Sequence, residues 1–126
     1  MSRTVIATAK APAAVGPYSQ GIAENGFLFI SGQLPLNPET GRLLEADIGK
    51  KTKLILSNAA AIAAKAGTDL SKVVKATIYL TDLEDFQAVN SAYAKFFPDE
   101  PPARSTVQVA ALPLESDIEI DFIVAL

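Results

Sequence analysis

Alternation of polar and small or apolar residues predicts a β-strand over Pro101–Val109. The two prolines that open this segment cannot donate to a β-ladder, so pairing begins after them. Arg104, Thr106 and Gln108 then share one face of the strand, because successive side chains point to opposite faces. A sheet seldom buries an arginine without a partner. Arg104 is therefore the first candidate functional residue.

The end of the chain, Asp117–Leu126, alternates in the same way. Glu119 and Asp121 share a face with Ile123, and apolar residues take the other face. Only a short connection separates this strand from the preceding one, so we expect the two strands to be antiparallel neighbours. A slip of one residue would place a polar row beside an apolar row. This register predicts that Arg104 and Glu119 share a face.

The amino-terminal part of the chain predicts three more strands. The first is short, over Thr4–Ala7. The next two, Gly21–Glu24 and Phe27–Ser31, flank Asn25-Gly26, which is the strongest short signal for a β-hairpin. Every residue of Phe27–Ile30 is apolar, so both faces of that strand need a cover.

Two helices and one further strand complete the predicted elements. Apolar residues recur at three- and four-residue steps over Asp47–Ala66, which is typical of an amphipathic helix. Val73–Leu80 alternates as a strand does. A second helix begins at Asp82, with Asp85 three residues later as in a capping box, and Pro98 ends it.

This order of elements predicts an α+β fold with two layers, in which two helices cover one face of a mixed β-sheet. Two helices, each about 10 Å across, cover about four strands spaced about 4.8 Å apart. The chain shows no linker or repeat, so we expect a single domain over residues 1–126. The uncovered face would expose apolar residues of Phe27–Ile30 in a monomer, which predicts a closed oligomer.

Composition narrows the possible chemistry. The 126 residues, 49% hydrophobic and 20% charged, describe one compact soluble domain. The absence of cysteine excludes a disulfide, a thiolate nucleophile and a zinc–sulfur site, and the absence of histidine removes the usual acid–base group near neutral pH. Carboxylates, Arg, Lys, Tyr, hydroxyls, backbone and water remain. We expect no metal and no cofactor.

Charge and hydropathy bear on location and partners. Fourteen acidic and eleven basic residues give a net charge of -3, which does not favour nucleic acid as a partner. No stretch approaches the roughly 20 apolar residues of a membrane span, so we expect a cytoplasmic protein without membrane contact. The basic cluster of Lys50, Lys51 and Lys53 is interpreted as a solvated helix face, because no glycine-rich loop or aromatic residue accompanies it.

Three polar residues each allow a structural and a functional interpretation. Tyr18, directly after the Gly16-Pro17 turn, either packs at a loop with its hydroxyl in water or lines a site. Asn90 lies on or beside the apolar stripe of the second helix, where its amide either satisfies a core hydrogen bond or orients a ligand. Glu119 either has a structural role, as an ion pair with Arg104 or a solvated acid on a sheet edge, or acts as a base.

Five short motifs are distributed along the chain. They are Gly16-Pro17-Tyr18-Ser19-Gln20, Ser31-Gly32-Gln33, Asn90 with Tyr93, Phe96 and Phe97, Pro102-Ala103-Arg104-Ser105-Thr106-Val107, and Ile118-Glu119-Ile120. Together they resemble the RidA (YjgF-like) family of reactive intermediate deaminases. The resemblance covers essentially the whole chain, and the arginine strand followed by Ile-Glu-Ile is its most specific part.

The resemblance implies a chorismate-mutase-like fold and a homotrimer with ligand clefts between subunits. It implies hydrolysis of 2-imino or enamine acids from pyridoxal-phosphate enzymes, such as 2-iminobutanoate and 2-iminopropanoate, to 2-oxo acids and ammonia. Such an enzyme limits metabolite damage. By the same resemblance Arg104 would bind substrate and Glu119 would serve the water. The cleft would be lined by Tyr18, Ser31, Gly32 and Asn90.

Thr106 departs from the pattern of the family, since many relatives carry cysteine there. Thiol-dependent activity or redox regulation is therefore not expected for this chain. A threonine hydroxyl can still donate a hydrogen bond to a substrate, but it is a poor nucleophile without a base beside it.

The chemistry of a 2-imino acid agrees with the resemblance. A guanidinium such as that of Arg104 grips a planar carboxylate with two parallel hydrogen bonds, and a nearby carboxylate such as Glu119 can hold a water and take its proton. Two other functions stay open. One is an endoribonuclease or translation inhibitor, as attributed to some relatives. The other is a non-catalytic carboxylate-binding module, which would use Arg104 but would not need Glu119.

Overall fold

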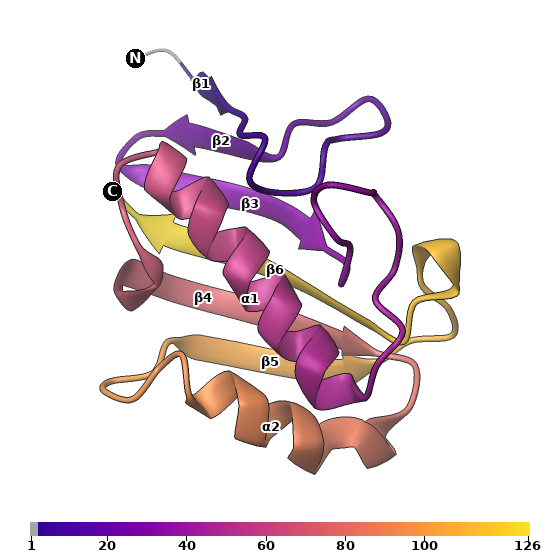
Figure 1. Cartoon of the computed structure of the whole chain (residues 1–126). Helices are drawn as coiled ribbons and strands as arrows, with labels where there is room; N and C mark the ends of the chain where they lie inside the picture. Colours follow the sequence, from indigo (N-terminus) through magenta and orange to yellow (C-terminus); the bar gives the residue numbers. More distant parts are fainter. Residues whose placement is uncertain (1–2) are drawn as a thin grey trace.

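A computed structural model describes residues 3–126, in which six strands and two α-helices form two layers (Figure 1). The strands are β1 (Thr4–Ile6), β2 (Gly21–Glu24), β3 (Phe27–Gln33), β4 (Val73–Leu80), β5 (Ala103–Gln108) and β6 (Ile118–Ala125). The helices are α1 (Ile48–Lys65) and α2 (Phe86–Ala94), with the short 3-10 helices η1 (Leu70–Lys72), η2 (Leu83–Asp85) and η3 (Pro113–Glu115). Within residues 3–126, none of the helices has the length and apolar character that crossing a membrane requires.

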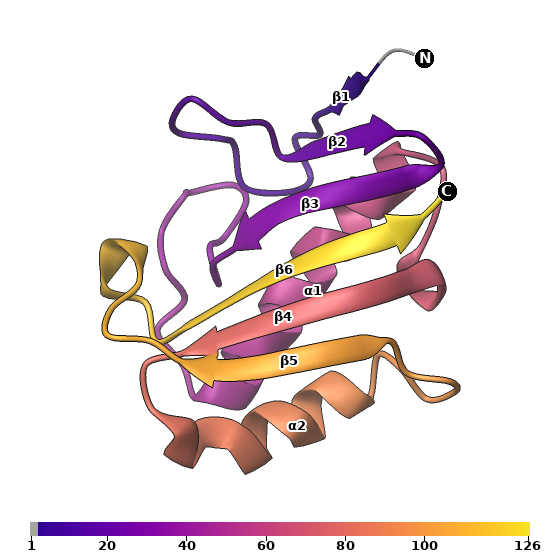
Figure 2. The same ribbon diagram turned by 180° about the vertical axis from the view of Figure 1, so that it is seen from behind.

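The strands form one mixed sheet in the order β1-β2-β3-β6-β4-β5. The pairing of β4 with β5 is parallel, and the other neighbouring pairs are antiparallel. Both helices lie on the same side of the sheet, and the view from behind shows the opposite face open (Figure 2). The predicted α+β architecture is thus confirmed, although the sheet has two strands more than the four that the helices were expected to cover.

The expected pairing of the arginine strand with the closing strand is wrong. β4 lies between them, antiparallel to β6 and parallel to β5. The helix-facing row of β4, which includes Ala76, Ile78 and Leu80, is fully buried, whereas β5 has no fully buried residue among those described. A central position buries more apolar surface, so the more apolar strand takes it. The short connection through η3 does not by itself make β5 and β6 neighbours.

The core lies between the helices and the sheet. β6 contributes a row of side chains that are at most 1% exposed, as its alternation predicts: Ile118, Ile120, Phe122 and Val124. Helix α1 covers this row with its own buried stripe: Thr52, Ile55, Leu56, Ala59, Ile62 and Ala63. Each fully buried large apolar side chain contributes about 1.5–3 kcal/mol. Burial of this kind holds the two layers together.

Local sequence signals set most element boundaries. The hairpin turn at Asn25 and Gly26 has positive φ angles of 55° and 86°, as a tight two-residue turn requires. Strand β3 then continues two residues beyond the predicted end, to Gln33. Helix α1 agrees with its predicted span, because the Asp47 side chain caps it by accepting a hydrogen bond from the Lys50 amide at 2.9 Å.

The second helix differs from its prediction at both ends. The Asp82 side chain accepts from the Glu84 amide at 2.9 Å, and the Asp85 amide donates instead to the Asp82 backbone carbonyl at 3.1 Å. The expected capping box is therefore wrong, and η2 precedes α2. Helix α2 ends at Ala94, four residues ahead of Pro98, and the chain then tightens, since the amides of Phe96 and Phe97 donate to the carbonyls three residues before them at 3.0 and 3.2 Å.

Candidate active site

Arg104 lies on the helix-covered face of β5, opposite Ala76 of β4. Its guanidinium carbon is 5.7 Å from the ring centroid of Phe86 and 4.9 Å from that of Tyr93, and both rings come from α2. Contacts of this kind contribute about 0.5–2 kcal/mol and hold the side chain in place. No carboxylate among residues 3–126 forms an ion pair with Arg104. Its positive charge is therefore available to an anion from outside the chain.

An open pocket of about 380 Å³ adjoins Arg104, and Asn90, Tyr93 and Phe97 line it together with two prolines. Three buried polar atoms on this side of the sheet have no hydrogen-bond partner within residues 3–126: Asn90 Oδ1, Tyr93 Oη and Thr106 Oγ1. Buried polar groups normally have partners, so a ligand or another chain is the expected source. Burial raises the pKa of Tyr93 to about 12, although Arg104 opposes the rise, so its hydroxyl stays protonated at neutral pH.

Glu119 lies on the open face of the sheet, opposite Tyr79 of β4. Its carboxylate covers Gly32 of β3, where a Cβ atom would collide with Glu119 Oε2. Only glycine leaves room for the carboxylate in this position. Desolvation by burial raises the pKa of Glu119, and the negative charge of Asp121 adds to the rise. A carboxylate with a raised pKa is a stronger base near neutral pH.

The segment before β2 adjoins Gly32. The hydroxyl of Ser31 donates to the Ser19 carbonyl at 2.5 Å, and the Ser31 amide donates to the Gln20 carbonyl at 3.0 Å. Tyr18 is 51% exposed and lines a small hollow of about 40 Å³ together with Gly32. Tyr18, Ser31, Gly32 and Glu119 are therefore close neighbours.

The expectation that Arg104 and Glu119 share a face is wrong. Arg104 pairs with Ala76 of β4, and Glu119 pairs with Tyr79 of the same strand. Ala76 and Tyr79 are three positions apart, which is an odd number. Alternation then places Arg104 and Glu119 on opposite faces. Register fixes a shared face only for strands that pair directly, and β4 lies between these two strands.

The predicted site residues thus fall into two groups. The arginine group, on the side of α2, consists of Arg104, Asn90 and Thr106. The glutamate group, beside the open face, consists of Glu119, Gly32, Ser31 and Tyr18. The structure brings the residues of each group together, but within one chain it does not bring the two groups together.

Sequence reasoning missed the role of two aromatic residues. The apolar stripe of α2 assigns Phe86 and Tyr93 to the core, and Tyr93 is indeed buried. Phe86, however, is 38% exposed, and both rings face Arg104. Their helical spacing indicates a core face equally well, so this contact could be found only once α2 was placed beside β5.

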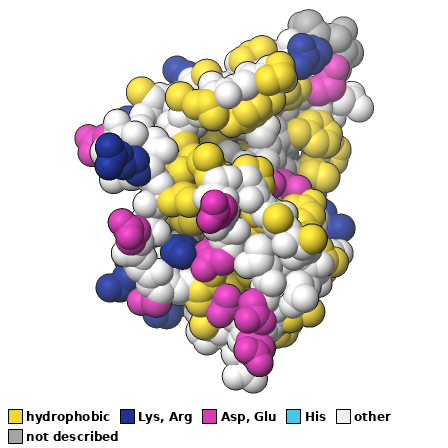
Figure 3. All heavy atoms as spheres, turned by 90° about the vertical axis from the view of Figure 1, so that its right-hand side faces the viewer, with side chains coloured by type: hydrophobic (Ala, Val, Ile, Leu, Met, Phe, Trp, Pro, Cys, Tyr) yellow, Lys and Arg dark blue, Asp and Glu magenta, His cyan; other side chains and the backbone are white. Residues whose placement is uncertain are grey.

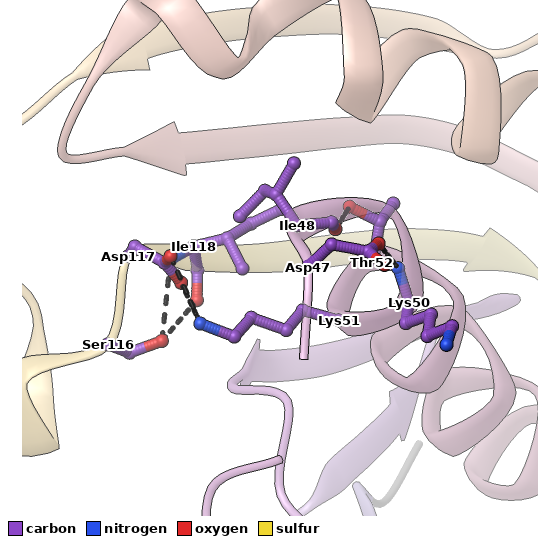
Figure 4. A network of polar contacts seen from close by, with 8 residues as sticks. All are labelled: Asp47, Ile48, Lys50, Lys51, Thr52, Ser116, Asp117 and Ile118. Atoms are coloured by element: carbon purple, nitrogen blue, oxygen red, sulfur yellow. Dashed lines mark hydrogen bonds and ion pairs between the residues drawn. The ribbon is translucent and has the colours of Figure 1, made fainter. Parts of the chain in front are cut away.

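The lysine cluster at the start of α1 is only partly solvated. Lys51 donates to both carboxylate oxygens of Asp117, at 3.2 and 3.1 Å, and so joins α1 to the start of β6 (Figure 4). Lys50 and Lys53 are exposed, as expected. Both side chains are still partly exposed, so this pair contributes about 1 kcal/mol. Among residues 3–126, no group of three or more carboxylates is arranged to hold a metal ion.

The fold and the two groups define a two-layer α+β protein in which the Arg104 guanidinium has no ion-pair partner among residues 3–126. The family model described as Endoribonuclease L-PSP matches residues 8–126. The chain belongs to this family, the YjgF/RidA family, and the resemblance read from its motifs is confirmed.

Individual relatives support this family assignment. Over 126 residues the chain is 51% identical to Reactive Intermediate Deaminase A, chloroplastic, of Arabidopsis thaliana, covering 100% of this chain and 67% of the relative. It is 46% identical over 121 residues to the 2-iminobutanoate/2-iminopropanoate deaminase of Capra hircus, covering 96% and 88%.

Two solved structures establish the fold. YyfA of Yersinia pestis, from the conserved Rid protein family, superposes with a TM-score of 0.96 at 47% identity, covering 99% of this chain and 100% of that one. TdcF of E. coli, solved with bound serine, superposes with a TM-score of 0.92 at 39% identity, covering 98% of each chain. The expected RidA-like fold is confirmed.

Proposed function

We propose that this protein hydrolyses reactive 2-imino and enamine acids, such as 2-iminobutanoate and 2-iminopropanoate, to 2-oxo acids and ammonia. The observation that carries the proposal is Arg104, which lies beside Phe86 and Tyr93 at an open pocket, with no ion-pair partner among residues 3–126. A guanidinium in this setting binds a planar carboxylate through two hydrogen bonds. The names of two relatives, both deaminases, support the reaction class, and the serine bound to TdcF supports a ligand of this size.

Glu119 is the proposed general base. A water held by its carboxylate attacks C2 of the protonated imine and gives one proton to Glu119, which yields a tetrahedral carbinolamine. That proton then passes to the nitrogen, and ammonia leaves with the electron pair of the C–N bond. The hydroxyl gives its proton to the Glu119 carboxylate as the 2-oxo acid forms, and the departing ammonia or water then takes that proton. An enamine acid first becomes the imine by gaining a proton at C3 and losing one from nitrogen. The raised pKa of Glu119 favours its role in these proton transfers.

We propose further that the site is completed between copies of the chain in a homotrimer. A single chain holds Arg104 and Glu119 on opposite faces of the sheet, so it cannot apply both to one small substrate. The open face also exposes large apolar side chains, including Phe27 at 40% and Phe29 at 45%. A second copy that covers this face would shield them and could bring its own Arg104 toward Glu119. The number three follows from the family resemblance.

The description of the family model raises a ribonuclease as the second candidate. Three observations weigh against it. The chain has no histidine, the commonest acid–base residue, and its net charge is -3. Acidic side chains also gather on the lower part of the face at which α1 and α2 begin (Figure 3). Such a surface repels the phosphates of RNA.

A coupled assay tests the proposal. An amino-acid oxidase or a threonine dehydratase generates the imine, and loss of the imine signal is followed with and without this protein. We expect the loss to be faster with it. Pyruvate affinity, measured by calorimetry, and digestion of a labelled RNA are recorded on the same preparation. Pyruvate binding without faster imine loss would establish the binding module, and RNA cleavage alone would establish the ribonuclease.

A further inference from the structure

Gln20 is a buried amide, 5% exposed, in the connection between β1 and β2. Its Nε2 donates to the backbone carbonyls of Thr8 at 3.0 Å, Ala11 at 3.2 Å and Pro12 at 2.7 Å. Its Oε1 accepts from the Thr8 amide at 2.7 Å. The donors and the carbonyl of this amide are thus all engaged by one stretch of backbone, residues 8–12.

The backbone of the same residue is tied to β3. The Gln20 carbonyl accepts from the Ser31 amide at 3.0 Å, and the preceding carbonyl, of Ser19, accepts from the Ser31 hydroxyl. The side chain of Gln20 therefore binds residues 8–12, and its backbone carbonyl binds Ser31. Tyr18 lies between these two attachments in the sequence and is held by them, although half of its own surface is exposed.

This connection borders the glutamate group. Pro12, Tyr18, Gln20 and Gly32 line the same small hollow, and Glu119 covers Gly32. In both ribbon views the connection between β1 and β2 extends toward the end of the molecule at which β3 ends (Figures 1 and 2). It therefore forms a wall beside the proposed base, and the hydrogen bonds of Gln20 fix where that wall stands.

We infer that Gln20 is a positioning residue for the proposed reaction: its amide fixes the β1–β2 connection so that Tyr18 bounds the cleft next to Glu119. The inference rests on the proposed function. The hydrogen bonds of the Gln20 side chain support it, because all of them go to residues 8–12 of the β1–β2 connection and none goes to a helix. Loss of the amide should free residues 8–19 and leave the layers of the core packed.

Two substitutions separate the contributions of this amide. Gln20→Met keeps the length of the side chain and removes its hydrogen bonds. Gln20→Glu keeps an acceptor for the Thr8 amide, but the ionised carboxylate cannot donate to the three carbonyls. Thr68→Val is the matched control, because it removes a single buried hydrogen bond, from the Thr68 hydroxyl to the Ala125 carbonyl at 2.7 Å. Ala125 ends β6, whereas Glu119 lies near its start.

We expect hydrogen exchange over residues 8–19 to accelerate in Gln20→Met while α1 and α2 keep their protection. Pyruvate affinity should fall, and kcat/KM for the imine should fall roughly 10- to 100-fold, mainly through KM, because a displaced cleft wall misplaces the substrate. In Gln20→Glu, protection of residues 8–19 should recover as the pH is lowered, because the protonated carboxyl regains a donor. Thr68→Val should resemble the parent in exchange over residues 8–19 and in affinity.

Faster exchange over residues 8–19 with unchanged pyruvate affinity and kcat/KM would overturn the inference, as would unchanged exchange. A parent protein without imine activity would refute the proposed function. In that case the pyruvate affinity of Gln20→Met still decides whether Gln20 shapes the ligand cleft.

Discussion

Arg104 and Glu119 point to opposite faces of one sheet, from the two strands that flank β4, and they pair with β4 residues three positions apart. Arg104 faces the rings of Phe86 and Tyr93 on the helix side, and Glu119 covers Gly32 on the open side. A reaction that uses both groups on one small molecule therefore needs two copies of the chain.

The assembly should depend on the open face of the sheet. We expect a native mass three times the chain mass of 13.3 kDa by light scattering. Phe29→Lys should give a folded monomer that no longer binds pyruvate, because it places a charge in the proposed contact between copies. Leu83→Lys is a matched control, since Leu83 is also 45% exposed but lies on η2. A trimer that survives Phe29→Lys would place the contact elsewhere.

Trimers that mix two impaired variants should recover activity that neither variant has alone. Arg104→Ala is expected to be inactive alone, and Glu119→Gln to keep at most about one hundredth of the parent rate. After the two are unfolded together and refolded, random assembly of a cyclic trimer makes about one quarter of all clefts intact, with Arg104 from one copy and Glu119 from its neighbour. The coupled assay should then show about one quarter of the parent rate. No recovery in verified mixed trimers would mean that no cleft combines Arg104 of one copy with Glu119 of another.

Arg104→Lys should keep the charge and lose most of the affinity. An ammonium cannot reproduce the paired hydrogen bonds of a guanidinium, so the dissociation constant for pyruvate should rise roughly tenfold or more. Arg104→Ala should abolish binding. Both variants should still unfold cooperatively near the parent temperature, because Arg104 lies beside an open pocket. A variant that fails to fold would show that Arg104 is structural.

Gly32→Ala should displace the proposed base without disturbing the core. The new methyl group would collide with Glu119 Oε2, and the carboxylate, at the end of a flexible side chain, would move away. We expect kcat/KM to fall roughly 100-fold, as for other small misplacements of a reacting group. Gly49→Ala on α1 makes the same chemical change at a residue that lines neither the pocket beside Arg104 nor the hollow beside Gly32, and it should retain the parent kinetics. Equal kinetics for the two variants would argue that the position of Glu119 does not matter.

Glu119→Gln should separate binding from chemistry. Gln can still hydrogen-bond a water but cannot accept its proton, so imine turnover should fall by about 10²–10⁴ while pyruvate affinity changes little. In the parent, kcat/KM should rise with pH as Glu119 loses its proton, and burial moves this rise above the ordinary carboxyl pKa of 4.5. The variant should lack the rise. Turnover at the parent rate would instead assign activation of the water to backbone groups or to the substrate's nitrogen.

Local sequence patterns determined much of the fold. The apolar row of β6, the turn at Asn25-Gly26 and the span of α1 all appear where the sequence places them. Each depends on interactions between residues close in the chain: the period of two in a strand, the positive φ angles of a tight turn, and a side-chain cap on a helix. The sequence also identified Arg104 and Glu119 as candidates, since each is a charged residue in the polar row of an alternating strand and lies in a motif that resembles the family.

Only the tertiary structure decided which faces these candidates occupy. Strand order is a non-local choice, and β4 takes the place between β5 and β6 because its helix-facing row, with Ala76, Ile78 and Leu80, gains most from burial under the helices. That choice turns Arg104 toward α2 and leaves Glu119 on the open face. Alternation along a strand fixes relative faces only between residues of that strand or of a known neighbour, and no pattern within β5 or β6 shows that β4 stands between them.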